Sequence, residues 1–544
     1  MPLSGENSGN TTGGPAADLI SPAPADRSGS PIELADGGAL PTGWVRGAAW
    51  AAVLGAGAVR FAYLASNRAT FNADEAVTGI MARNILHGHN YSFYPGQSYG
   101  GTLEPYLQTL SYLVFRLPQN PLTLRLALVF LGMVTCYLTW LCALRIVPDP
   151  RVALVAPAVF AVGPWFNVLG GSTALGFYVA GTAMATGAVY CALRVTDPGV
   201  RPLWWIAALG FCSGLALWQT VTTAVLVVPA LMWAGPTVVR SRRSAVTWAV
   251  AGLAGSLPAW VQLVSSGHVP LPGSPPERTS MLTRVVRLVG PEFREFIGVS
   301  YPHDHGGAPR AVQFAAVAIL ATAYLLALVR RRRRVAAVMT SDRTNRRPVD
   351  ILLLAPVVLV VMFACSSSAW YTGTPRYLFP AYPLFAIALA AMASAVPGRA
   401  GSRLLAVSIV AATAALSVNY FRGAVETPTT NDRIAAYRLV VADLRSHGET
   451  RVYADYWTAM PLRYVAGGSI DVGVFHGAIR FTAMQNRVAA SADPVYLGDA
   501  LNGNAAILVR ALTSHGITYR TRTVGFVTVF DHLSSPVRPA ALGV

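Results

Sequence analysis

The sequence contains no lysine and little charge of either sign. Charged residues make up 12% of its 544 residues and hydrophobic residues 53%, whereas a soluble domain carries about 25% charge. This composition excludes an ordinary soluble enzyme, and it excludes disorder as the dominant state, because disordered chains have low hydrophobicity and high charge. The cysteines are odd in number and lie inside apolar runs, which argues against a disulfide framework or a zinc site. They are Cys136, Cys142, Cys191, Cys212 and Cys365.

The basic residues are all arginines, and they give the chain a net charge of +17 and a pI of about 10.0. A basic pI can indicate nucleic-acid binding. Here the arginines lie between long apolar runs, a pattern that is typical of membrane topology. The sequence therefore predicts a multi-pass membrane protein that contacts the lipid bilayer and not nucleic acid.

Apolar runs of membrane-spanning length follow an N-terminal segment, 1–43, whose Gly, Pro, Ser, Ala and Asp content predicts a disordered tail. The first run, Trp44 to Ala65, is long enough to remain as a transmembrane helix. The segment 203–235 would be about 50 Å long as one helix, against a hydrocarbon core of about 30 Å. Two helices that turn near Trp218–Gln219 fit better. The other runs are 121–145, 151–169, 173–194, 244–264, 310–329, 349–369, 377–396 and 403–420.

The distribution of arginine sets the topology. With the N-terminus inside, arginines concentrate in the loops predicted to be cytoplasmic, among them the run Arg330 to Arg334, while the short outer turns hold only Arg376. The positive-inside rule therefore favours about eleven transmembrane helices with a cytoplasmic N-terminus in the plasma (inner) membrane. Three regions then face outward: a loop over 66–120, a loop over 265–309, and the tail 421–544.

The tail differs in composition from the membrane domain 44–420. Helical patterns alternate with short apolar runs that are typical of strands, which predicts a small extracytoplasmic α/β domain. The predicted helices are Ile434 to His447 and about 504–515. The predicted strands are Arg451 to Tyr456, Asp471 to Phe475, Pro494 to Leu497, 517–522 and 525–530.

The first outer loop contains an acidic pair, Asp74 and Glu75, at the start of a predicted helix. Asn72 suits the N-cap and Glu75 suits its capping partner, which is a structural explanation of Glu75. Val77, Met81 and Ile85 lie within about 60° of Asp74 around such a helix, so Asp74 points toward the apolar side. A carboxylate there is costly unless it is paired or used. The alternative is a first-turn acid that interacts with the helix dipole.

Further along the same loop, Gln97, Tyr99 and Glu104 are candidates for lining a polar cavity at the membrane surface. Glu104 could equally be a first-turn acid of a second juxtamembrane helix, Leu103 to Leu117. In the later stretch from Trp370 to Pro383, Arg376 lies at the outer mouth of a helix, with Tyr371 and Tyr377 assigned to the cavity. Arginines at such positions commonly snorkel to the interface, but a guanidinium there also suits bidentate binding of a lipid-linked phosphate.

The second outer loop contains His303, Asp304 and His305. Two histidines without a third distant ligand are weak evidence for a metal, and solvated loop residues are the favoured interpretation.

These features together resemble the GT-C glycosyltransferases, in the branch of the protein O-mannosyltransferases and the lipid A aminoarabinose transferase. The resemblance rests on the inside-first topology, the Asp-Glu pair, Arg-Tyr-Leu-x-Pro-x-Tyr-Pro from Arg376, and the outer tail, and it covers about 44–420. The stretch Tyr453 to Trp457 is also similar to the tails of bacterial members. A His-Pro-Pro element of many relatives is replaced here by Gly-Gly-Thr-Leu-Glu-Pro, which leaves the acceptor class open.

The resemblance implies transfer of a sugar, with inversion, from a polyprenyl-phosphate carrier to a hydroxyl of a glycan, lipid or protein acceptor on the outer face, as in cell-envelope synthesis. It implies that Asp74 is the general base, with Glu75 beside it, and that Arg376 and, less directly, Arg83 contact the carrier phosphate. The first loop has no Asp-x-Asp motif, so a divalent metal is not predicted.

Two other classes of function remain open. A flippase or transporter of lipid-linked sugars usually places ionisable residues near the midplane of its spans, often in repeated halves. The predicted spans hold almost no carboxylates, Arg125 is a rare basic residue at one span end, and no repeat is apparent. A non-catalytic subunit that displays the C-terminal domain is the third possibility.

Overall fold

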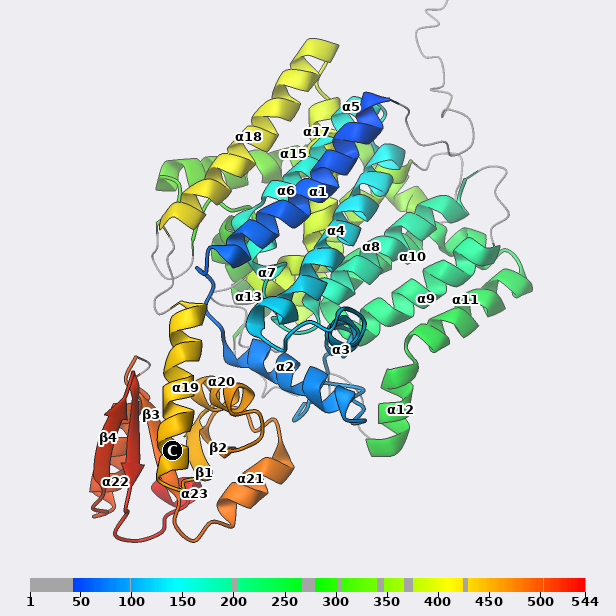
Figure 1. Cartoon of the computed structure of the whole chain (residues 1–544). Coiled ribbons are helices and arrows are strands. Elements are labelled where there is room, and N and C mark those ends of the chain that lie inside the picture. Colours follow the sequence, from blue (N-terminus) through cyan, green and yellow to red (C-terminus); the bar gives the residue numbers. More distant parts are fainter. Residues whose placement is uncertain are drawn as a thin grey trace, which may run out of the picture. The chain divides into compact units, whose positions relative to one another are not determined.

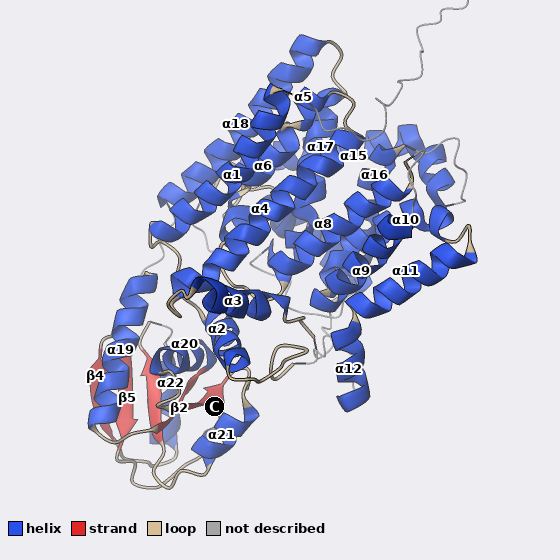
Figure 2. Cartoon of the chain, turned by 45° about the vertical axis from the view of Figure 1, so that its right-hand side comes forward, coloured by secondary structure: helices blue, strands red, loops and turns tan. Residues whose placement is uncertain are grey.

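The computed structural model describes the chain from residue 43 onward with short gaps. The described ranges are 43–97, 99–197, 203–266, 279–301, 306–339, 347–365, 375–423, 429–501 and 503–543. Apart from Gly43, the predicted tail 1–43 lies outside them, as do Tyr371 and the His303 to His305 triplet. Pro41–Val544 forms one compact unit. Figure 2 shows that the strands gather in one sheet with helices beside it, and these strands all lie in the C-terminal part of the sequence. The predicted boundaries at 43/44 and 420/421 remain predictions.

The membrane part is a bundle of helices (Figure 1). Every predicted span coincides with helical structure, although several helices are interrupted. The bundle comprises α1 (Trp44–Ala65), α4 (Pro121–Ile146), α5 (Pro150–Ala153), α6 (Val155–Val162), α7 (Trp165–Gly170), α8 (Tyr178–Val195), α9 (Leu203–Gln219), α10 (Ala224–Val238), α11 (Arg242–Gly255), α12 (Leu257–Ser266), α15 (Arg310–Met339), α16 (Ile351–Cys365), α17 (Tyr382–Ser394) and α18 (Arg399–Gly423).

Seven helices of the described chain are long and apolar enough to cross a membrane, or eight if the bent pair α11–α12 counts as one span. The remaining predicted spans are shorter or broken, such as α9 and the series α5 to α7. The count of eleven crossings and the inside-first orientation therefore remain predictions. The predicted division of 203–235 is confirmed, because α9 ends at Gln219 and a 3-10 turn, η2 (Val221–Thr223), precedes α10.

Two buried arginines of the bundle helices, Arg60 and Arg125, have polar partners inside the protein. Arg60 of α1 is completely buried, and it donates to the carbonyl oxygens of Ala56 and Asn167. Arg125, near the start of α4, pairs with Glu75 in the first outer loop. The bundle therefore contains a second buried arginine besides the one that the sequence pattern singled out.

The two loops that were predicted to face outward form short helices, and one of these helices packs against the C-terminal domain. The first loop forms α2 (Ala73–Leu86) and α3 (Leu103–Phe115), and α2 packs against α3, α4 and α20 (Tyr456–Ala466) (Figure 1). A side chain at Gly79 of α2 would overlap the Tyr464 ring of α20, so the glycine permits this close approach. The second loop forms α13 (Met281–Arg287), η3 (Leu288–Glu292) and α14 (Phe293–Phe296).

The C-terminal domain is a five-stranded mixed sheet with helices, as predicted. The strand order is β2-β1-β3-β5-β4; β1, β2 and β3 are parallel to one another, and β5 pairs antiparallel with both β3 and β4. The strands are β1 (Arg451–Asp455), β2 (Asp471–His476), β3 (Val495–Asp499), β4 (Arg520–Val524) and β5 (Val527–Asp531). The helices are α19 (Thr430–Ser446), α20, α21 (Thr482–Ala489), α22 (Asn504–Ser514) and α23 (Pro539–Leu542). Because β1 and β2 are parallel, the segments that follow them leave the same edge of the sheet.

Candidate active site

A cavity with about 460 Å³ of empty space contains the predicted acid Asp74. Its lining comes from α2, the loop after it, the start of α8, the turn η5 (Pro375–Ala381) and the C-terminal domain. Of the described residues that line it, Asp74 is the only acid. The lining residues are Asp74, Val77, Tyr94, Gln97, Tyr99, Leu175, Gly176, Phe177, Tyr178, Arg376, Tyr377, Tyr456 and Arg480. The cavity thus combines one carboxylate, two guanidiniums and several tyrosines.

The helix that carries Asp74 starts as the sequence predicts. Asn72 is the N-cap, and its side chain accepts a hydrogen bond from the Glu75 amide at 3.0 Å. Val77 and Met81 are buried, whereas Asp74 shares the cavity with Val77. Asp74 therefore lies on the side of α2 that the apolar pattern predicted.

Two partners hold the Asp74 carboxylate. Tyr456 is the first residue of α20 in the C-terminal domain, and its hydroxyl donates a hydrogen bond to Asp74 Oδ1 at 2.7 Å. An Nη atom of Arg376 lies 3.5 Å from Oδ2. Burial raises the pKa of Tyr456, and the neighbouring Asp74 carboxylate raises it further, so this hydroxyl keeps its proton at neutral pH. The Asp74 side chain is therefore oriented by two partners and remains 21% exposed.

Glu75, although adjacent to Asp74, points into the protein and does not line the cavity. It forms a completely buried ion pair with Arg125, with nitrogen–oxygen distances of 2.8 and 2.6 Å. Its Oε1 also accepts from the amide of Ala174 at 2.9 Å. The Glu75 side chain therefore bonds a distant arginine and not the backbone of Asn72, and it fixes α2 to the bundle.

Glu104 has a similar structural position at the start of α3. Its Oε1 accepts from the amides of Val179 and Ala180 in the first turn of α8, each at 3.0 Å. Glu75 and Glu104 thus hold the two ends of the segment 174–180, whose middle forms one wall of the cavity. Both acids belong to the support of the site.

The remaining predicted residues divide into two groups. Gln97, Tyr99, Arg376 and Tyr377 line the cavity together with Asp74. Arg83 does not, since it donates to the carbonyl oxygens of Tyr464 and Gln119 and lies 4.0 Å from the centre of the Tyr464 ring.

The contribution of the C-terminal domain to the lining was not predicted from the sequence. Tyr456 lies in the stretch Tyr453 to Trp457, which resembles family tails, so a signal for it existed. Arg480, between β2 and α21, carried no such signal.

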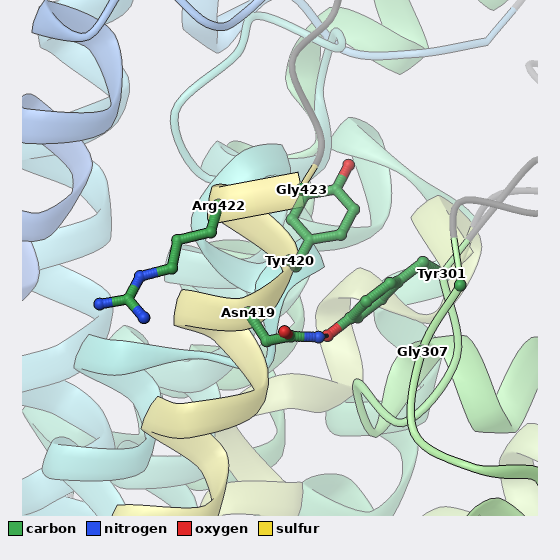
Figure 3. A pocket seen from close by; sticks show the side chains of 7 residues that line it. Tyr301, Gly307, Asn419, Tyr420, Arg422 and Gly423 are labelled. Atoms are coloured by element: carbon green, nitrogen blue, oxygen red, sulfur yellow. Dashed lines mark hydrogen bonds between the residues drawn. The ribbon is translucent and has the colours of Figure 1, made fainter.

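A second, wider cavity of about 750 Å³ lies beside the C-terminal end of α18. In Figure 3, Tyr301 and Asn419 point toward one another, and the Asn419 amide donates to the Tyr301 hydroxyl at 2.9 Å, while Arg422 points away. No acid occurs among the described residues that line it. Among the described residues of the two cavities, Asp74 is therefore the better candidate for a general base.

No triad of histidine, cysteine or acidic side chains that could hold a metal ion occurs in the described part of the chain. The cavity of Asp74 offers a single carboxylate, whereas divalent cations in phosphate-transfer sites are usually bound by one or two carboxylates together with the substrate.

Burial of Glu104 has a measurable consequence for stability. Desolvation raises its pKa from 4.5 to about 8, so the folded protein holds this proton at a pH where the unfolded chain has lost it. The free energy of unfolding should therefore fall as pH rises from about 4.5 to about 8, and level off above. Glu104→Gln keeps an oxygen acceptor but cannot ionise. We expect melting temperatures of this variant to lose that decline between about pH 5 and pH 8, and an unchanged decline would contradict the assignment.

Comparison with known proteins extends these observations. No protein-family model matches the chain, and no curated protein matches its sequence. Solved structures do match. ArnT from Cupriavidus metallidurans bound to undecaprenyl phosphate is 13% identical with a TM-score of 0.57, over 92% of this chain and 100% of that one. ArnT is a lipid A aminoarabinose transferase with a GT-C fold. The chain has the GT-C fold.

Two more structures support the GT-C fold. Apo ArnT from the same organism is 14% identical with a TM-score of 0.56, over 90% of this chain and 97% of that one. The apo oligosaccharyltransferase of Archaeoglobus fulgidus is 12% identical with a TM-score of 0.50, over 86% and 71%. At such identities the likeness establishes the architecture, and chemistry has to be argued from the residues of the cavity.

Proposed function

We propose that this protein transfers a sugar from a polyprenyl-phosphate carrier to an acceptor hydroxyl at the outer face of the membrane, in the synthesis of a cell-envelope glycan or glycoprotein. The observation that carries the proposal is the oriented carboxylate of Asp74 beside the Arg376 guanidinium, in a cavity at the end of an apolar bundle. The likeness to ArnT, whose structure holds undecaprenyl phosphate, supports a lipid-linked donor.

The reaction assigns one role to each charged group. Asp74 accepts the proton of the acceptor hydroxyl as its oxygen attacks the anomeric carbon of the sugar. The bond between that carbon and the phosphate oxygen breaks, and polyprenyl phosphate leaves with the bonding electrons. Arg376 stabilises the negative charge on the departing phosphate. With Asp74 as the base and no covalent enzyme intermediate, the scheme is a single displacement, which inverts the anomeric centre.

The aromatic lining suits the other part of the donor. Tyr99 and Tyr377 lie in the cavity with Asp74, and Tyr99 packs edge-on against Phe177. Rings with polar hydroxyls present an apolar face and a hydrogen-bonding edge. We assign Gln97, Tyr99 and Tyr377 to binding of the sugar, hexose or pentose, or of the acceptor.

The proposal is tested by incubating the purified full-length protein with acceptor-containing membranes and a panel of labelled polyprenyl-phosphate sugars. We expect one donor to be consumed and its label to appear in acceptor material. Sealed liposomes with the same donors measure movement across the bilayer. Movement of a donor without any transfer would contradict the proposal and favour a flippase.

A further inference from the structure

The C-terminal domain contributes a charged residue, Arg480, to the cavity, and the reaction proposed above assigns no role to this residue. Arg480 follows β2, at the same edge of the sheet from which Tyr456 follows β1. Its Nη1 donates to the Gln97 side chain, and its guanidinium carbon lies 5.6 Å from the centre of the Tyr456 ring. Its Nε is shielded from solvent and has no acceptor in the described structure. Arg480 therefore lines the cavity and has one N–H group without a hydrogen-bond acceptor among the described residues.

Arg376 enters the same cavity from the membrane domain. Its Nε is likewise shielded and lacks an acceptor among the described residues. Asp74, Arg376 and Arg480 all act electrostatically on the Tyr99 hydroxyl: the arginines lower its pKa and Asp74 raises it, against a larger rise caused by burial. Asp74, Arg376, Arg480 and Tyr99 all line the same cavity.

The charges of this space do not balance. Two guanidiniums stand against one carboxylate in the described lining, so an anion would supply the missing charge and the missing acceptors. A phosphate group offers several strong acceptor oxygens, and paired guanidiniums bind it well because each presents a planar fork of donors.

Two other arginines of this region do not line the cavity. Arg83 donates to two backbone carbonyl oxygens, although its Nε also lacks an acceptor among the described residues, and Arg487 forms a two-point ion pair with Asp471.

We propose that Arg480 and Arg376 together bind the phosphate group of the lipid carrier, so that the C-terminal domain completes the donor site. The inference rests on the proposed function, since that function makes the anion a polyprenyl phosphate. This shared role also explains why Tyr456 and Arg480 follow two parallel strands at the same edge of the sheet. Tyr456 contacts the base, Asp74, and Arg480 contacts the phosphate leaving group. The two domains then contribute to one reaction.

The test is equilibrium binding of polyprenyl monophosphate to the full-length protein in detergent or nanodiscs, with polyprenol and inorganic phosphate as comparison ligands. We expect Arg480→Gln to weaken binding of polyprenyl phosphate about 10- to 100-fold, as loss of a hydrogen bond to a charged group does. Binding of polyprenol should not change. Inorganic phosphate should compete weakly with the lipid in the wild type and still less in the variant, because it lacks the apolar chain.

Two further variants make the result specific. Arg480→Lys keeps the charge and should recover part of the affinity, whereas Arg510→Gln removes a charge from the exposed face of α22 and should have no effect. Melting temperatures confirm that each variant is folded. Unchanged affinity in folded Arg480→Gln, or an equal loss for polyprenol and polyprenyl phosphate, would overturn the inference. Phosphate-dependent binding without transfer from any sugar donor would instead contradict the proposed function and leave the two-arginine site intact.

Discussion

Replacing Asp74 with asparagine should abolish most sugar transfer while leaving the protein folded. The amide has nearly the shape of the carboxylate and can still accept the Tyr456 hydrogen bond, so the cavity should persist. It cannot accept a proton from the acceptor, and loss of a general base lowers rates by about 10²- to 10⁴-fold. The measurement is the transfer rate per folded molecule with the donor found in the panel.

The matched control for Asp74→Asn is Asp493→Asn, the same change at an exposed position of the C-terminal domain. It should transfer at the wild-type rate. A wild-type transfer rate in Asp74→Asn would show that Asp74 is not the general base, even though the chain has the GT-C fold.

Replacing Glu75 with glutamine should lower stability and not the transfer rate, the opposite of Asp74→Asn, because the Glu75 carboxylate holds a buried ion pair. Its partner Arg125 is only 4% exposed and would keep a positive charge without a counter-ion. Removing one partner of a buried ion pair costs about 3–5 kcal/mol of folding free energy. We expect Glu75→Gln to lower the melting temperature and the folded yield sharply, while the molecules that do fold retain their transfer rate.

The double variant Glu75→Gln/Arg125→Met separates the ion pair from other effects at this position. Without either charge, the buried site no longer holds an uncompensated ion, so stability should recover in part relative to Glu75→Gln alone. Normal stability combined with lost turnover in Glu75→Gln would make Glu75 a reacting group after all.

The contrast between Asp74 and Glu75 shows what the sequence could predict. The spacing of Asn72, Asp74, Val77 and Met81 was enough to predict the N-cap and the side of α2 on which Asp74 lies, because helix geometry is local. The partner of Glu75 could not be predicted in this way. Arg125 lies 50 positions further along the chain, and tertiary contact overrode the capping role that the local pattern suggested.

The same distinction applies to the C-terminal domain. Its strands and its first and fourth helices follow from alternating and periodic patterns, and the structure places them close to the predicted ranges. The helix α20 was missed because it contains Pro461, a residue that normally argues against a helix interior. Its first residue is Tyr456, which reaches Asp74 across 382 positions of sequence. Such a contact depends on how α20 packs on α2, which no local pattern encodes.

The most direct test of the central claim is the anomeric configuration of the product, determined by NMR on sugar transferred from a donor of known configuration. If Asp74 acts as the base of a single displacement, the anomeric centre must invert, because the acceptor oxygen attacks opposite the departing phosphate. We predict a fully inverted product. A product that retains the donor configuration would require two successive displacements, with an enzyme group as the first nucleophile, and would contradict the role assigned to Asp74.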